Sequence, residues 1–158
     1  MSYGFVFKII SLVLAVCCPI IMITMFPLRS SLSWYWDTPA LPLFILTTIP
    51  TSYFFLTTTG WKLPGICLLL LTIFPVTTHG YIHNVTAVLF FVLSGYALMQ
   101  STKSTLLVKS LYLLASVACG LHLLLGEIYM IWVLCLHHGI VSYRLYKAQK
   151  QFANRLDN

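Results

Sequence analysis

The side chains able to perform acid–base or metal chemistry are few, and most lie beside three short polar breaks between apolar runs. Two of the chain's three carboxylates and three of its five histidines belong to this set. Imidazole and carboxylate groups bind zinc, and a carboxylate beside the metal acts as a general base. If the three breaks share one side of a membrane, they form an outer polar cluster of Arg29, Asp37, His79, His83, His122 and Glu127.

The spacing of two histidines carries most of the metal hypothesis. His79 and His83 are four residues apart, so they share a helix face if the helix continues through Gly80. With a group from another break they would supply two or three ligands, but no HExxH motif accompanies them. Two alternatives stay open: a pocket for a headgroup or small ligand, and hydrogen bonds across helix ends and to lipid headgroups.

A second pair of histidines lies far along the last apolar run. His137 and His138 are adjacent, so on a helix they point about 100° apart and cannot both face one partner. One could ligate a haem opposite His122, but His122 lies nearer the outer end of the chain's last two runs. We expect hydrogen bonds to a neighbouring helix instead, and neither a zinc nor a haem cofactor.

The elements that must position these groups follow from composition. Charged residues make up 8% of the chain and hydrophobic residues 59%, with a mean hydropathy of +0.92. A soluble domain carries about 25% charged residues, and a membrane-spanning helix needs about 20 apolar ones. We therefore predict an all-α, polytopic bundle of six transmembrane helices in a single membrane domain, residues 1–158. The predicted spans are 4–26, 38–58, 61–78, 81–100, 104–125 and 127–147, followed by a basic tail at 148–158.

The basic residues predict the orientation. Six spans place most of them on one side and Arg29 alone on the other, which favours cytoplasmic N- and C-termini. The positive charge lacks the aromatic-interleaved stripe of nucleic-acid-binding proteins, so we expect no nucleic-acid partner. The tail either contacts anionic lipid headgroups or is a solvated helix end. Its basic residues are Arg144, Lys147, Lys150 and Arg155.

Several short motifs resemble small bacterial six-span membrane proteins that look distantly like the DRAM and GPI-lipid-remodelling families. The resemblance covers residues 31–146. The matching pieces are Ser31-Leu32-Ser33-Trp34-Tyr35-Trp36-Asp37-Thr38, Ile73-Phe74-Pro75, His83-Asn84-Val85-Thr86-Ala87 followed by Phe90-Phe91, and Glu127 at the start of the last span. It implies a six-helix bundle in a bacterial inner membrane, with a polar outer site centred on Asp37, His83 and Glu127. It implies no particular reaction.

We therefore expect a non-catalytic membrane subunit or lipid-interacting protein, with membrane lipids, other membrane subunits or a second copy of the chain as partners. The first alternative is a metal-dependent enzyme that acts on lipid headgroups at the outer face through Asp37, His83 and Glu127. A b-type cytochrome and a channel or transporter are weaker alternatives, the latter because no span carries the regular polar stripe of a pore.

Overall fold

The structure, a computed structural model, describes residues 3–156, which form six α-helices and one short 3-10 helix without any strand. The all-α fold class is thereby confirmed. The helices are α1 (Tyr3–Met25), η1 (Leu32–Tyr35), α2 (Leu41–Leu56), α3 (Lys62–Ile73), α4 (Val76–Gln100), α5 (Leu106–Leu121) and α6 (Leu123–Leu156).

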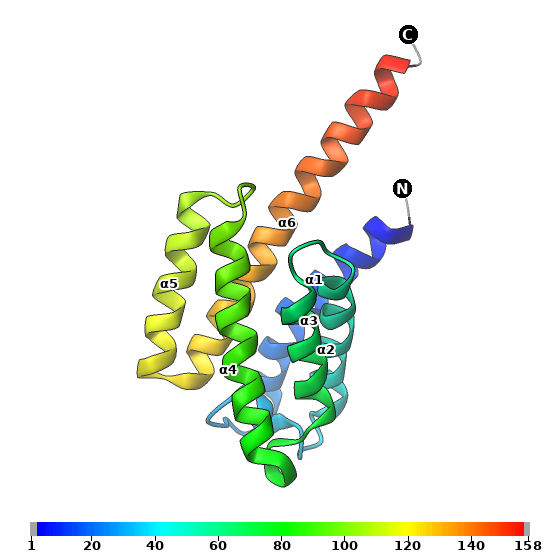
Figure 1. The fold of residues 1–158 in the computed structure, drawn as a ribbon. Helices are drawn as coiled ribbons and strands as arrows, with labels where there is room; N and C mark the ends of the chain where they lie inside the picture. Colours follow the sequence, from blue (N-terminus) through cyan, green and yellow to red (C-terminus); the bar gives the residue numbers. More distant parts are fainter. Residues whose placement is uncertain (1–2, 157–158) are drawn as a thin grey trace.

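Successive α-helices run in opposite directions, so the bundle has two distinct ends (Figure 1). The end we call the termini end carries the start of α1, the end of α6 and the turns at 57–61 and 101–105. The opposite end, the η1 end, carries η1, the α3–α4 link and the α5–α6 link. Helix α6 packs on both α1 and α5, and its last turns extend well beyond the bundle. The side chain of Arg155 lies outside the described residues.

Three of the six helices have the length and hydropathy of a membrane span: Gly4–Met25, Val76–Gln100 and Leu123–Phe152. The other three, α2, α3 and α5, are apolar but only 16, 12 and 16 residues long. At 1.5 Å per residue α3 is about 18 Å long, whereas the hydrocarbon core is about 30 Å thick. A membrane protein with three long apolar helices is therefore supported, and six spans stay a proposal.

The predicted spans are separated at Gly60, Gly80 and Gly126, and the structure places breaks at Gly60, at His79 beside Gly80, and at His122 instead of Gly126. Gly60 has φ +83, a conformation suited to glycine, and ends the α2–α3 turn as predicted. Helix α3 ends at Phe74–Pro75, because a residue before proline is disfavoured in the α conformation. The chain leaves helical geometry again at His79, directly before the predicted break at Gly80. Gly126 lies inside α6, and the chain turns at His122 instead.

Gly126 has a packing role in the crossing of α5 and α6. Only His122 separates these two helices, so their ends must lie very close. A Cβ atom on Gly126 would overlap the backbone of Cys119 on α5. Gly120, by contrast, faces open space. The close approach of α5 and α6 therefore depends on Gly126.

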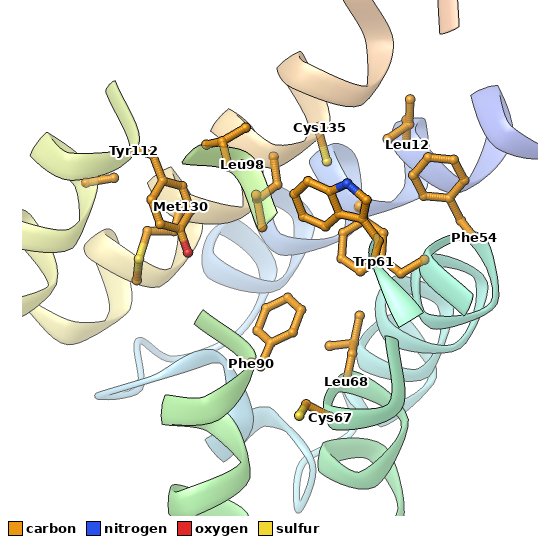
Figure 2. Packing of buried hydrophobic residues seen from close by; sticks show 14 of the residues in the cluster. Leu12, Phe54, Trp61, Cys67, Leu68, Phe90, Leu98, Tyr112, Met130 and Cys135 are labelled. Atoms are coloured by element: carbon orange, nitrogen blue, oxygen red, sulfur yellow. The ribbon is translucent and has the colours of Figure 1, made fainter. Parts of the chain in front are cut away.

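The core consists of two groups of buried side chains. The smaller group lies at the η1 end, where Tyr35 and Met22 are fully buried against the first turns of α6. The larger group fills the bundle from its middle to the termini end, with Trp61 near Phe54 and Cys135 (Figure 2). This larger group combines aliphatic side chains with five aromatic ones, Phe54, Phe55, Trp61, Phe90 and Tyr112.

Candidate functional site

Glu127 is the buried carboxylate of the η1 end. It lies in the second turn of α6 and is 6% exposed, and its Oε2 accepts a hydrogen bond of 2.8 Å from the backbone N–H of Leu32. Leu32 is the first residue of η1, whose N-cap is Ser31. Because a buried carboxylate is costly without donors, this bond anchors the α1–α2 connection to α6.

His83 is buried in α4 and holds the α3–α4 link. Its Nδ1 donates a 2.7 Å hydrogen bond to the carbonyl of Phe74, where α3 has ended before Pro75. The ring is 1% exposed, and its Nε2 has no hydrogen-bond partner among the described residues. His83 thus supplies a donor to a carbonyl at a helix break.

The other four members of the outer polar cluster are exposed. Two of them bond locally: Nδ1 of His79 pairs with the Thr78 hydroxyl at 2.8 Å, and Nδ1 of His122 accepts from the N–H of Leu125 at 3.4 Å. The exposed members are Arg29, Asp37, His79 and His122. None of the hydrogen bonds found in the described part of the chain joins two members of the cluster.

The local backbone explains why the histidine pair does not converge. His79 has φ −131 and ψ 37, outside the helical region, so α4 is kinked at His79. The four-residue spacing places two side chains on one face only in a regular helix. Within residues 3–156, no group of three or more histidine, cysteine or acidic side chains is close enough to hold a metal ion.

The haem hypothesis requires histidines at matched depth, and His122 and His137 lie at different depths. His122 lies at the α5–α6 link, and His137 follows fifteen residues later, about 22 Å along a helix. His137 and His138 are instead buried near the termini end, each 3% exposed.

Sequence reasoning missed a cleft at the termini end. Its volume is about 570 Å³, and it lies between the α2–α3 turn, the α4–α5 turn and α6. Hydroxyl, amide and ammonium groups line it beside three buried aromatic rings. Its lining residues include Trp61, Tyr96, Gln100, Thr102, Lys103, His137 and His138.

The His138 ring is enclosed by aromatic rings. The centroid of its ring lies 4.3 Å from that of Trp61, 4.8 Å from that of Phe54 and 5.1 Å from that of Phe55. Its Nε2 is buried and has no hydrogen-bond partner within the described part of the chain. An unsatisfied buried polar atom costs about 1–3 kcal/mol, so this atom is a natural contact for a polar group entering the bundle.

His138 also lines a second, smaller cavity of about 60 Å³ inside the bundle. That cavity is lined mostly by apolar residues, among them Leu12, Leu68 and Phe90, whose side chains are labelled in Figure 2. Glu127 lines it too, eleven residues and about 16 Å before His138 along α6. One helix therefore carries a carboxylate and an imidazole at the two ends of an apolar interior.

Basic side chains gather around the cleft. Lys103 lines it, and Arg144 donates a 3.4 Å hydrogen bond to the carbonyl of Lys103. Lys109 Nζ donates to the carbonyl of Met99 at 2.6 Å, one residue before the lining amide of Gln100. No described carboxylate lies at this end, because both described acidic residues belong to the η1 end. The termini end is therefore locally cationic.

Comparisons with known protein families, with curated proteins and with solved structures found no match.

Proposed function

We propose that the chain is a six-span integral membrane protein that acts without catalysis, through contacts with lipids and with other membrane helices. The observation that carries this proposal is the apolar outer surface of the bundle. Large hydrophobic side chains point outward along α4 and α5 and are exposed by 59% or more. They include Tyr81, Val88, Val92, Tyr96, Leu106, Leu107, Leu113, Leu114, Val117 and Leu121.

An apolar surface of this extent is unusual for a protein surrounded by water. Soluble monomers rarely expose contiguous apolar patches larger than a few hundred Å², because each Å² in water costs about 25 cal/mol. In a bilayer the same side chains lie against acyl chains at no such cost. Helices also associate there by close packing, which suits other membrane subunits or a second copy of the chain as partners.

The alternating helix directions support six spans despite three short helices. Helices α2, α3 and α5 each run antiparallel to the helices before and after them (Figure 1). A helix shorter than the hydrocarbon core is accommodated by local bilayer thinning or by snorkelling of flanking residues. Lys62 and Lys103 at the termini end then agree with a cytoplasmic location for that end, as the positive-inside rule requires.

Reporter insertion at the Gly60 turn tests this topology most sharply. If α2 and α3 both cross the bilayer, a reporter in this turn is cytoplasmic, as are reporters at both termini. If α2 and α3 form a re-entrant hairpin, the same reporter never reaches the cytoplasm. A matched reporter between Arg29 and Asp37 should be external. A Gly60 reporter that is inaccessible from the cytoplasm, with the other three as expected, would refute six spans.

A further inference from the structure

The cleft at the termini end has the chemistry of an anion site. Its lining combines the Lys103 ammonium, the Gln100 amide and the Thr102 hydroxyl, all of which donate hydrogen bonds. None of its lining residues is acidic. A ligand bearing several acceptor oxygens and a negative charge would therefore be favoured, and a cation would be repelled.

The surroundings of the cleft add positive potential. Helix α3 starts at the cleft, and its N-cap residue, Trp61, makes no side-chain capping bond, so the first N–H groups of α3 have no side-chain partner there. The opposite partial charge, at the carbonyl end of α4, is reduced by Lys109, which donates to the Met99 carbonyl. The helix ends and the side chains thus both favour a negatively charged ligand.

The place of the cleft in the bundle favours a lipid over a soluble anion. One wall is the last turn of α4, whose apolar span ends at Gln100. Tyr96 lines the same wall and is 64% exposed, which is typical of an aromatic residue at the membrane–water interface. The cleft therefore lies at headgroup depth, beside an apolar surface against which acyl chains can pack.

We propose that this cleft binds the phosphate headgroup of an anionic phospholipid, with Lys103 as its charged contact and Trp61, His137 and His138 as its floor. Basic pockets between membrane helices on the cytoplasmic side bind lipid headgroups of this kind. The inference deepens the lipid-interacting function proposed above, because it names the ligand class and the site.

The test uses the full chain, purified in a mild non-ionic detergent and titrated with phosphatidylglycerol while retained lipid is counted by native mass spectrometry. We expect one phosphatidylglycerol per chain and little retention of zwitterionic phosphatidylcholine. Lys103→Gln should weaken binding about five-fold, the equivalent of about 1 kcal/mol for one lysine near an anionic headgroup. Thr102→Trp, an exposed turn position, should block the cleft without disturbing the core.

Lys62→Gln is the matched control. It removes one positive charge from the same end of the bundle, but Lys62 is exposed and does not line the cleft. Equal losses for Lys62→Gln and Lys103→Gln would mean general electrostatic attraction and would overturn the site. Displacement of the lipid by glycerol 1-phosphate at the same concentration would show that the cleft binds a soluble phosphate ester rather than a lipid. This result would also overturn the proposal. Absence of retained phosphatidylglycerol from a protein whose reporters support six spans would refute this inference alone.

Discussion

Replacement of Glu127 tests whether the buried carboxylate is structural. Its Oε2 is the hydrogen-bond acceptor for the Leu32 N–H at 2.8 Å, and Leu32 is itself only 6% exposed. Glu127→Ala therefore leaves a buried N–H without an acceptor, which costs about 1–3 kcal/mol, and it also removes side-chain volume from the cavity wall. We expect the free energy of unfolding to fall by about 3 kcal/mol.

Glu127→Gln separates the hydrogen bond from the charge. The amide oxygen of glutamine can still accept from Leu32, so the loss is limited to the difference between a charge-assisted and a neutral bond, about 1 kcal/mol. The matched control is Asp37→Ala, because Asp37 is an exposed carboxylate at the same end of the bundle. Exposed substitutions of this kind change stability by less than about 0.5 kcal/mol.

The assay is equilibrium unfolding of the purified protein in mixed micelles, followed by helical circular dichroism. Limited proteolysis of the 26–40 connection is a second readout, because Glu127 anchors this connection through Leu32. Cleavage there should increase in Glu127→Ala and stay unchanged in Asp37→Ala. Equal destabilisation by Glu127→Ala and Asp37→Ala would refute the argument, as would a glutamine variant as unstable as the alanine variant.

Two further predictions concern the packing and the environment of α5. Gly126→Ala should force α5 and α6 apart at Cys119 and lower the free energy of unfolding by about 3 kcal/mol in the same assay. Gly120 faces open space, so Gly120→Ala should be neutral or slightly stabilising. Similar effects of the two variants would contradict the close crossing. Leu114→Arg places a charge on the exposed apolar face of α5 and should make the apparent free energy of membrane insertion of this helix less favourable by about 3–4 kcal/mol. A fully integrated Leu114→Arg protein would show that this face does not contact acyl chains.

Apolar run length predicted the helices better than it predicted their ends. Each of the six predicted segments overlaps mainly with one α-helix of the structure, because long apolar runs leave the backbone few other ways to satisfy its hydrogen bonds. The turns depended on finer effects. Pro75 ended α3 through its effect on the preceding residue, and Gly126 served close packing rather than a turn. A glycine in the sequence does not by itself indicate whether it makes a turn, as Gly60 does, or allows close packing, as Gly126 does.

The candidate site was harder to predict because its contacts are distant in sequence. The partner of Glu127 is a backbone N–H 95 residues away, and a backbone donor has no sequence signature. Trp61 meets His138 across 77 positions, and nothing in either local pattern indicates that contact. The sequence did place Lys62 and Lys103 at the same end, because the positive-inside rule acts on whole loops rather than on individual contacts.

Helix α6 shows why the two polar ends of the bundle are chemically separate. Glu127, Ile131, Leu134 and His138 follow one another at spacings of four, three and four residues, so they share the helix face that lines the inner cavity. The two polar groups of this face, Glu127 and His138, lie at its ends, near the connections between helices. The middle of the face is apolar, which avoids the cost of polar groups at membrane depth. At the carboxylate end, one oxygen of Glu127 already accepts a hydrogen bond from the chain's own Leu32 N–H. The imidazole end has an unpartnered nitrogen and a cationic cleft above it. Along this face of α6, a ligand from outside the chain therefore has more to gain at His138 than at Glu127.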